Sequence, residues 1–344
     1  MRVTHSDDGF YPDIISTNCA NSIVIEGIDY RVPCGRCLPC QKKRRSDWSL
    51  RLEHEYLAAD SAFFITLTYD DHNLPFHYYK NVYKKDDKGK IIDRWKVLQK
   101  SNYPTTNKKD LIDYVKRLRY DHKKYNQKHN TKAQSLRYYG VGEYGSKSRR
   151  PHYHLLLFNI DIANLAPIYN QWKRKGHKNK LGFVHVGTVS SASINYVTKY
   201  MFKDFDRKHD EREPPFSIMS KKPIIGNSYL EQYGSFHLDT ESLITADSKG
   251  NNRRIPKAYL YKLWQKYQQV WDTNKKQYVW KMAKDTDKIK DLTDKSYKKH
   301  YKEKIEQFEK NLKKYYNGDT IDYLKTQESE LARKVHKLNN AEFL

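Results

Sequence analysis

Residues 135–158 read SLRYYGVGEYGSKSRRPHYHLLLF, and this stretch decides the fold. Its two ends, SLRYYGVGEYG and HYHLLLF, are rich in the aromatic and aliphatic residues that favour β-strands, and a basic segment with a proline separates them. We therefore expect a β-hairpin. Because side chains alternate along a strand, His152 and His154 share one face of the second strand, and Tyr153 points to the other face. Two histidines on one face, where a charged turn becomes an apolar run, suggest a metal site or an acid–base site.

The first strand of the expected hairpin adds a carboxylate. If the hairpin is symmetric about its turn, Glu143 lies opposite His152, and directly paired residues point to the same side of a sheet. Two imidazoles and one carboxylate then converge, a set that can bind a divalent metal ion and leave positions open for water or phosphate oxygens. A register shift of one residue would turn Glu143 to the other face. The metal site of Glu143, His152 and His154 is therefore a hypothesis that depends on the register.

The segments around this hairpin follow an order that is typical of an α+β fold. FFITLTYDD (63–71) and GFVHVGTV (182–189) have the composition of strands. Helical periodicity or capping residues mark four further segments, which are residues 38–60, the segment after Asn107, residues 162–174 and residues 191–203. Strand, helix, hairpin, helix, strand and helix in this order predict a largely antiparallel sheet with flanking helices.

Composition divides the chain into three expected parts. Residues 1–60 contain all four cysteines and a basic helix, and residues 61–230 contain the α+β core. Within the core, residues 77–106 are polar and lysine-rich, which favours an exposed insertion. Residues 231–344 form a charged C-terminal extension, and from about residue 261 onward the pattern predicts helices.

The charge of the chain points to nucleic acid as its partner. Among 344 residues there are 65 lysines and arginines against 41 aspartates and glutamates, which gives a net charge of +24 and attracts phosphates. The 29 tyrosines suit stacking on the bases of single strands. No apolar run approaches the roughly 18 residues of a spanning helix, and the first residues lack the apolar centre of a signal peptide. We expect a soluble, cytoplasmic protein with no membrane partner.

The segment SASINYVTKYMFK (191–203) carries two tyrosines one helical turn apart. Tyr196 and Tyr200 are four residues apart and so lie on one face of the helix, away from an apolar stripe that suits packing on the sheet. Lys199 and Lys203 lie near the pair, where a cation can hold a phosphate or lower the pKa of a phenol. Metal ligands on a sheet together with tyrosines on a helix are the groups that attack on a DNA phosphodiester requires.

These motifs resemble those of a known family. HYH in RPHYHLLLF is similar to the His-hydrophobic-His motif of the HUH endonucleases, the rolling-circle replication initiators, although Tyr153 replaces the usual aliphatic middle residue. YVTKY resembles their two-tyrosine motif, and FITLT resembles their first strand. CGRCLPC, GVGEYG, YVTKYM and FSIMSKKPIIG look like the initiators of gokushovirus-type microviruses, which are small single-stranded DNA phages. The resemblance covers about residues 30 to 230.

The resemblance implies a fold, a cofactor and a mechanism. The fold would be a ferredoxin- or RRM-like HUH core with Mg²⁺ or Mn²⁺ bound by His152, His154 and Glu143. One of Tyr196 and Tyr200 would nick the origin strand and become joined to its 5′ phosphate, and the other would act when the displaced strand is closed. The free 3′ hydroxyl would prime a host polymerase, with a host helicase, in the cytoplasm of a bacterial host cell.

Seven basic residues are expected to contact the phosphates of single-stranded and origin DNA. They are Lys42, Lys43, Arg44, Arg45, Arg149, Arg150 and Lys203. For the four on the basic helix, a solvated basic face is an equally good interpretation.

The cysteines raise a separate question. Cys34, Cys37 and Cys40 form a C-x₂-C-x₂-C pattern, and Cys19 lies fifteen residues before the first of them. In a reducing cytoplasm this spacing suits thiolate coordination better than disulfides. Structural zinc, an iron–sulfur cluster and unligated thiols remain open.

Other functions agree with parts of the sequence. Within the HUH enzymes, a relaxase or a transposase would use related chemistry. A zinc-stabilised nucleic-acid-binding protein without catalysis would account for the cysteines and the charge. Two histidines and one acid are also the ligand set of non-haem iron oxygenases. The tyrosine helix separates the nicking enzymes from the other two classes, because only a nicking enzyme needs Tyr196 or Tyr200.

Overall fold

The computed structural model describes residues 19–24, 31–79, 82–88, 90–95, 99–131, 134–145, 148–200, 212–274, 276–300 and 302–341. The chain forms two compact units, one of Leu52–Asn227 and one of Met1–Arg51 together with Ser228–Leu344. Among the helices in the described residues, none combines the length and the hydropathy that crossing a bilayer requires.

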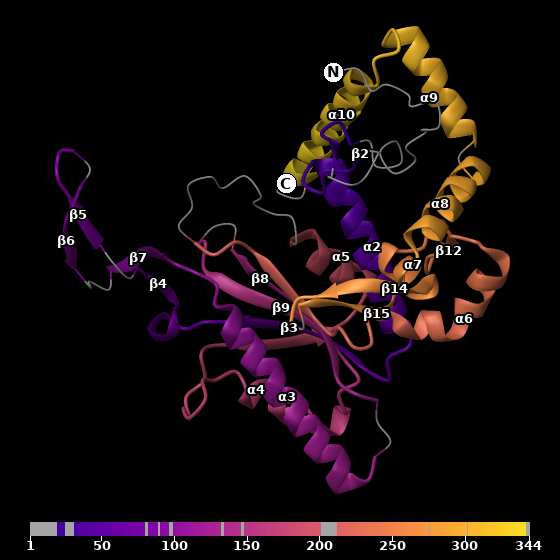
Figure 1. The fold of residues 1–344 in the computed structure, drawn as a ribbon. Helices are drawn as coiled ribbons and strands as arrows, with labels where there is room; N and C mark the ends of the chain where they lie inside the picture. Colours follow the sequence, from indigo (N-terminus) through magenta and orange to yellow (C-terminus); the bar gives the residue numbers. More distant parts are fainter. Residues whose placement is uncertain are drawn as a thin grey trace. The chain divides into compact units, whose positions relative to one another are not determined.

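The unit of residues 52–227 is built on a five-stranded sheet (Figure 1). Its strands are β3 (Ala62–Thr68), β8 (Arg137–Tyr144), β9 (Pro151–Phe158), β10 (Val184–Thr188) and β11 (Phe216–Met219). They lie in the order β10-β3-β9-β8-β11, and every neighbouring pair is antiparallel. The predicted α+β class, an antiparallel sheet with flanking helices and a helical C-terminal extension, is therefore confirmed.

The hairpin of β8 and β9 has the register that brings the carboxylate beside the histidines. Glu143 is paired directly with His152, and on the other side of β9 His154 is paired with Thr66 of β3. The amide of Gly145 donates a hydrogen bond to the carbonyl of Arg150, at 3.0 Å, and closes the turn symmetrically. The register expected of a symmetric hairpin is confirmed, and the metal-binding role of its residues stays a prediction.

One face of this sheet is covered by α3 (Lys108–His129). The helix begins where expected, because the side-chain oxygen of Asn107 accepts a hydrogen bond from the amide of Lys109 at 3.0 Å. Its apolar side joins a buried cluster with residues of β3 and β9; the cluster includes Leu111, Tyr114, Val115, Leu118, Ile65, Leu67, Tyr153, Leu155, Leu157 and Trp172. The residues that alternate with these along β9, His152 and His154, therefore face away from α3.

The opposite face contacts α5 (Ser191–Tyr200), which lies against β8 and β9. Ser190 and Ser193 cap the helix reciprocally: the Ser190 hydroxyl accepts from the Ser193 amide at 3.2 Å, and the Ser190 amide donates to the Ser193 hydroxyl at 2.9 Å. Ile194 and Val197 are fully buried. The apolar stripe of α5 thus anchors the tyrosine helix on the face that carries the histidines.

The helix predicted over residues 162–174 is wrong. The structure has a short 3₁₀ helix, η2 (Ile162–Asn164), followed by α4 (Ala166–Asn170). The cause is Pro167, which lies in the first turn of α4 and could not lie inside a longer helix, because it has no N–H and clashes with the preceding turn. Trp172 then packs in the core, and its indole N–H donates to the carbonyl of Thr68 at 2.8 Å.

The lysine-rich insertion contains strands that its composition did not predict. β4 (Phe76–Tyr79) pairs with β7 (Gln99–Pro104), and between them β5 (Val82–Lys85) pairs with β6 (Ile91–Trp95). Both ladders are antiparallel and contain a register irregularity.

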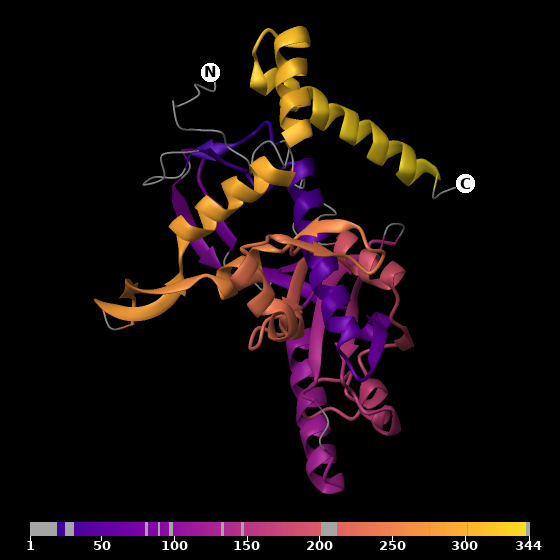
Figure 2. The same cartoon turned by 90° about the vertical axis from the view of Figure 1, so that its right-hand side faces the viewer.

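The other unit joins the N-terminal residues to the last third of the chain. Its elements are β1 (Ile23–Val24), β2 (Arg31–Val32), the first part of α2 (Leu38–Leu57), α6 (Asn227–Thr240), β12 (Ile244–Ala246), β13 (Asn252–Arg254), α7 (Lys257–Leu263), β14 (Gln265–Asp272), β15 (Gln277–Lys284), α8 (Thr286–His300), α9 (Lys302–Tyr315) and α10 (Thr320–Ala341). The helices at the C-terminal end are yellow in Figures 1 and 2.

Two of these elements correct the expectation of helices from about residue 261. β14 and β15 form an antiparallel hairpin over residues 265–284. The segment contains Tyr267, Trp271, Tyr278 and Trp280 in alternating positions, a pattern of strands that its many lysines obscure.

Candidate metal and tyrosine site

Three ligand atoms converge on the face of the sheet that α5 covers. Oε1 of Glu143 lies 2.9 Å from Nε2 of His152 and 3.1 Å from Nε2 of His154. One ligand atom from each residue lies within 4.8 Å of the others. The sheet thus brings together the three residues that the sequence proposed as metal ligands.

Each imidazole is oriented through its other nitrogen. Nδ1 of His152 donates a hydrogen bond to the carbonyl of Arg150 at 3.1 Å, and because a carbonyl only accepts, the proton of the neutral ring lies on Nδ1. Nδ1 of His154 lies 3.0 Å from the hydroxyl of Thr66. Such outer partners fix the ring and the tautomer of metal-binding histidines. The Nε2 lone pair of His152 is thereby directed at Glu143.

This arrangement requires a cation between the three residues. Neutral His152 presents a lone pair to the carboxylate of Glu143, and two acceptors at 2.9 Å repel each other unless a proton or a metal ion lies between them. Oε2 of Glu143 is also buried and has no hydrogen-bond partner among the described residues. Buried polar atoms in proteins are normally satisfied, so the donor set fits a divalent ion.

The protonation states of the site suit metal binding. Burial alone would raise the pKa of Glu143, but the hydrogen bonds with His152 and His154 outweigh it and hold the pKa below its ordinary value. Burial lowers the pKa of His154, and the hydrogen bond with Glu143 opposes this only in part. An ionised carboxylate and a neutral imidazole are the forms that bind metals.

Tyr196 of α5 lies beside these ligands. Its ring meets the ring of His154 edge-on with the centroids 5.2 Å apart, and it also meets Phe64 of β3 at 6.1 Å. Phe64 in turn stacks on His154 at 5.4 Å. Tyr196 is 39% exposed, so a strand of nucleic acid can reach its phenol.

The other residues proposed around the tyrosines are less fully described. Lys199 is half-buried in the last turn of α5. The backbone of Tyr200 ends this helix, and its side chain lies outside the described part of the structure. Lys203 also lies outside the described residues. Their roles stay predictions.

The two arginines of the β8–β9 turn have different surroundings. Arg149 is exposed and has a left-handed backbone, with φ of 54°. The guanidinium of Arg150 pairs with Asp71 and donates to the carbonyl of Tyr69 at 2.9 Å. Arg150 therefore ties the turn to the end of β3, and Arg149 is the one whose side chain extends to solvent.

The expected basic helix contributes to a groove of about 500 Å³ in the other unit. Its lining includes six lysines and arginines against two acids: Lys42, Lys43, Arg253, Arg254, Lys257, Lys334, Asp47 and Glu330. Burial raises the pKa of Asp47, and nearby Lys43, Arg254 and Lys257 oppose that rise. The exposed Arg44 and the half-buried Arg45 lie on the same helix.

Several functional candidates escaped the sequence reasoning. Thr66 and Phe64 contact His154 from β3, and their signal is the alternation in FFITLT, which places both on one face. The basic run RRIPK at 253–257 supplies part of the groove and could have been found from charge alone.

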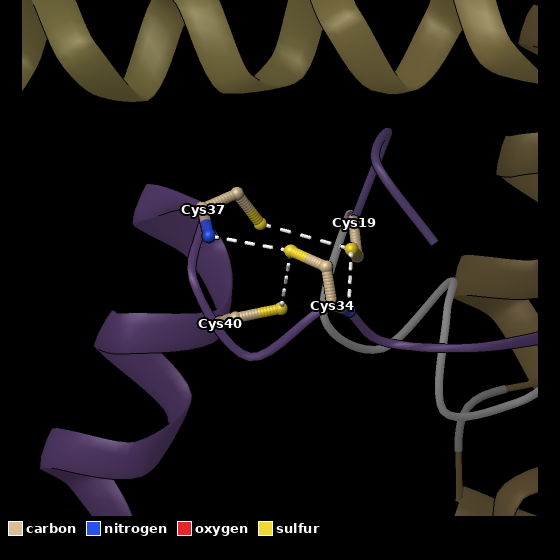
Figure 3. A group of neighbouring side chains, drawn as sticks. All are labelled: Cys19, Cys34, Cys37 and Cys40. Carbon is tan, nitrogen blue, oxygen red and sulfur yellow. Dashed lines mark hydrogen bonds between the residues drawn. The ribbon is translucent and has the colours of Figure 1, made fainter. Parts of the chain in front are cut away.

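The four cysteines come together, as Figure 3 shows. Their sulfur atoms all lie within 4.8 Å of one another. The hydrogen bond from Cys40 is the main reason that the pKa of Cys19 falls to about 5, whereas burial raises the pKa of Cys37 to about 12. The hydrogen bond to Cys19 is the largest reason that the pKa of Cys40 is raised. Without a cation, these thiols share one negative charge and cannot all ionise.

Comparisons with known proteins agree with the fold and the motifs. Residues 62–205, which run from the start of β3 past the end of α5, match the family of the replication-associated protein ORF2. The hairpin of β8 and β9 and the tyrosine helix both lie inside this match. No solved structure matches the chain.

Three phage proteins are similar over more of the chain. Replication-associated protein VP4 of Bdellovibrio phage phiMH2K is 29% identical over 216 residues, which are 59% of this chain and 59% of the relative. Replication-associated protein ORF2 of Spiroplasma virus 4 is 26% identical over 66% of each chain. Replication-associated protein ORF4 of Chlamydia phage 1 is 23% identical over 53% of this chain and 40% of the relative.

The alignments thus span less than two thirds of each relative's length. The resemblance to replication initiators of small phages, noted from the motifs, is confirmed by these matches.

Proposed function

We propose that this protein initiates rolling-circle replication of a small single-stranded DNA phage genome by nicking and rejoining DNA at the origin. Its similarity to replication-associated phage proteins supports a role in replication initiation. The observation that carries the nicking activity is the position of Tyr196, a partly exposed phenol whose ring centroid lies 5.2 Å from that of His154. The net charge of +24 supports DNA as the substrate.

Glu143, His152 and His154 would hold the divalent cation, Mg²⁺ or Mn²⁺. When bound, such an ion polarises the scissile phosphate and offsets the charge that develops on it. Two of the three ligand atoms are imidazole nitrogens, which favours Mn²⁺ over Mg²⁺, since Mg²⁺ prefers oxygen. The sulfur ligands of the four-cysteine cluster are assigned to a different ion, the structural Zn²⁺ expected from the sequence.

In the covalent step, the phenol oxygen of Tyr196 forms a bond to the phosphorus, and the bond from phosphorus to the 3′ oxygen breaks. The phenol proton is released and the 3′ oxygen takes up a proton, so the products are a 5′-phosphotyrosine and a free 3′ hydroxyl. Lys199, three residues further along the same helix, places a positive charge near the phenolate that forms. Phe64 restrains the ring of His154 and contacts Tyr196, which fixes the nucleophile relative to the ligands.

The later steps follow from the products. The free 3′ hydroxyl would prime a host polymerase, and a host helicase would open the duplex, in the cytoplasm of a bacterial host cell. Tyr200 would provide the second nucleophile after one round, when the regenerated origin is cut and the displaced strand is closed.

The test detects the covalent intermediate. Purified protein is incubated with Mn²⁺ and labelled single-stranded oligonucleotides that tile the replicon encoding the chain, and SDS-resistant adducts are measured. We expect an adduct on one sequence, lost in Tyr196→Phe and in His152→Ala. Tyr169→Phe is the matched control, because Tyr169 is 41% exposed and lies on α4, and it should form the adduct at the normal rate. An adduct that persists in Tyr196→Phe would move the first cut to Tyr200, and the absence of any adduct would refute nicking.

A second candidate is a zinc-stabilised nucleic-acid-binding protein without catalysis. The four-cysteine cluster and the basic groove favour it. In that case Tyr196→Phe would leave both DNA binding and phage replication intact. A relaxase or a transposase of the HUH type would form the same adduct, and would differ in the DNA sequence that it cuts.

A further inference from the structure

The four-cysteine cluster has the dimensions of a site for one metal ion. Sγ of Cys37 lies 3.7 Å from Sγ of Cys19, and Sγ of Cys34 lies 4.0 Å from Sγ of Cys40 (Figure 3). A tetrahedron with zinc–sulfur bonds of about 2.3 Å has edges of about 3.8 Å. The two measured edges therefore agree with a tetrahedral Zn²⁺ site.

Other states of the cysteines fit less well. A disulfide would bring two sulfur atoms to about 2.05 Å, far shorter than either measured separation. All four cysteines are free. A cluster of several iron atoms needs room between its thiolates, whereas these four sulfur atoms lie within 4.8 Å of one another. The space between them suits a single ion.

The backbone around the cluster is arranged to stabilise thiolates. The amide of Cys34 donates to the sulfur of Cys19 at 3.3 Å. The amides of Arg36 and Cys37 both donate to the sulfur of Cys34, at 3.4 and 3.3 Å. Gly35 has φ of +74°, a left-handed conformation that glycine adopts without strain, and it allows this turn. Cys40 lies in the first turn of α2, where the helix dipole favours negative charge.

The surrounding fold offers little else to hold this segment. β1 and β2 have only two residues each, and Ile23 is 46% exposed. Small regions without a sufficient apolar core commonly depend on a metal ion. A site with four protein ligands has no open position for substrate, so its role is structural.

We propose that Cys19, Cys34, Cys37 and Cys40 bind one Zn²⁺ in a closed tetrahedral site, which joins the segment before β1 to the start of α2. The ion takes the place of an apolar core in this part of the chain. It is chemically separate from the cation of the Glu143, His152 and His154 site.

The test measures metal in the full chain purified under reducing conditions. We expect one zinc per chain by elemental mass spectrometry, its loss in Cys34→Ser, and its retention in His152→Ala. Replacement by Co²⁺ should give the intense visible and near-ultraviolet absorption of tetrahedral thiolate coordination. If Cys34→Ser does not fold, release of zinc from the intact protein by a mercurial, followed with a zinc-sensitive dye, gives the same stoichiometry. Bound iron, or four thiols that titrate freely without any metal, would overturn the assignment.

A different observation supports an independent inference about the β14–β15 hairpin. Tyr267 pairs with Met282, Gln269 with Trp280, and Trp271 with Tyr278. Because paired residues point to the same side and alternate residues share a face, these six side chains lie on one face of the hairpin. Five of them are large and at least half exposed: Tyr267 68%, Trp271 51%, Tyr278 65%, Trp280 67% and Met282 51%.

Such a face indicates a partner, because proteins rarely expose contiguous apolar surface of this kind without one. The partner is expected to be an anion, since residues 265–284 contain five lysines and one aspartate. Aromatic side chains in a basic setting are the means by which proteins bind single-stranded nucleic acid without sequence preference. Trp271 and Tyr278 already meet edge-on, with centroids 5.2 Å apart, which leaves ring surface accessible on the outside.

We infer that this aromatic face stacks on the bases of single-stranded DNA. The inference shares with the proposed function only the identity of the partner, and it requires neither the nicking tyrosine nor a divalent ion.

Fluorescence anisotropy with labelled oligo-dT, without added divalent cation, tests this binding. Trp271→Ala with Trp280→Ala should weaken affinity by about tenfold or more, since each stacked base contributes substantially. Tyr315→Ala is the control, because Tyr315 is 64% exposed on α9, and it should bind like the original chain. Unchanged affinity in the double variant would overturn the inference, as would a chain that dimerises through this face instead. Adduct formation by the same variant on saturating DNA shows separately whether nicking is intact.

Discussion

The protein contains two clusters that suit metal ions, and they differ in every respect that determines what an ion can do. The four cysteines provide a complete set of like ligands, whereas Glu143, His152 and His154 provide three ligands beside a partly exposed tyrosine. A complete set leaves no position for substrate, and an incomplete set leaves at least one. Ligand number and access thus separate a structural site from a catalytic one within a single chain.

The two clusters also differ in what holds them together. The histidines lie on β9, which pairs with strands on both sides and packs over a buried cluster. The cysteines lie on a loop and at the start of a helix, beside strands of two residues. We therefore expect the histidine site to exist without its ion, and the cysteine site to form only with one.

The largest expected effect is that of removing the proposed zinc. Its release should expose the amides of residues 31–40 to hydrogen exchange, because structural zinc can contribute about 10 kcal/mol to folding. The amides of β8 and β9 should keep their protection. Mass spectrometry of exchange before and after treatment with a mercurial checks both. Equal loss of protection in the two regions would remove the distinction between the clusters.

The second effect concerns what holds the histidine strands in the absence of metal. The buried guanidinium of Arg137 on β8 pairs with Glu55 and donates to the carbonyls of Pro223 and Ile224 at 2.9 and 2.7 Å. Glu55→Ala leaves this charge buried and unpaired, which should cost about 3 to 5 kcal/mol in the free energy of unfolding. Urea denaturation measures it. Asp113→Ala, which breaks the exposed pair with Lys109, is the control and should cost less than about 1 kcal/mol.

The third effect tests the histidine site itself. Glu143→Gln keeps the size of the side chain and removes the charge that holds a cation, so adduct formation should fall by about 100-fold or more. The melting temperature and the zinc content should stay close to those of the original chain. A large loss of stability in this variant would mean that the triad, like the cysteines, depends on its ion to fold.

The fourth effect is a pH dependence in the unit that carries the sheet. Burial lowers the pKa of His54 to about 4, below its ordinary value of 6.5. The unfolded chain therefore takes up a proton first, so this histidine lowers the free energy of unfolding as the pH falls from about 6.5 to 4, by about 2 to 3 kcal/mol. Urea denaturation at pH 7 and 4.5 measures it. His54→Gln should have a smaller pH dependence, and an equal one would assign the effect to other groups.

The smallest effect concerns the helix that carries Tyr196. Ser190→Ala removes the hydroxyl that accepts from the Ser193 amide, which should cost about 1 kcal/mol. Adduct formation should fall only slightly at saturating Mn²⁺, because the buried Ile194 and Val197 still hold the helix. Thermal denaturation and the adduct assay together check this. A severe loss of activity would show that the cap, rather than the apolar stripe, positions the phenol.

Local patterns in the sequence predicted the parts of the fold that depend on near neighbours. Two-residue alternation and a symmetric turn were enough to place Glu143 opposite His152, since both strands lie within one hairpin. The spacing of Ile194, Val197 and Tyr196 likewise predicted which side of the helix is buried.

Features that depend on distant residues could not be predicted in the same way. The contacts of Phe64 and Thr66 with His154 join strands some ninety residues apart in the chain. The hairpin of β14 and β15 was taken for helix because lysines break up its aromatic alternation and because no buried face marks it. The pairing of the first residues with the last third of the chain in one unit has no local signal at all.

The hydrogen bond between His152 and the carbonyl of Arg150 has a consequence for how the protein can vary. The acceptor belongs to the main chain, so a change of side chain at position 150 leaves the acceptor itself in place. Whether the imidazole keeps its proton on the correct nitrogen is therefore encoded in the path of the polypeptide through the turn. An engineered or natural variant can lose that preference only by reshaping the loop, for instance through an insertion or deletion between the two strands.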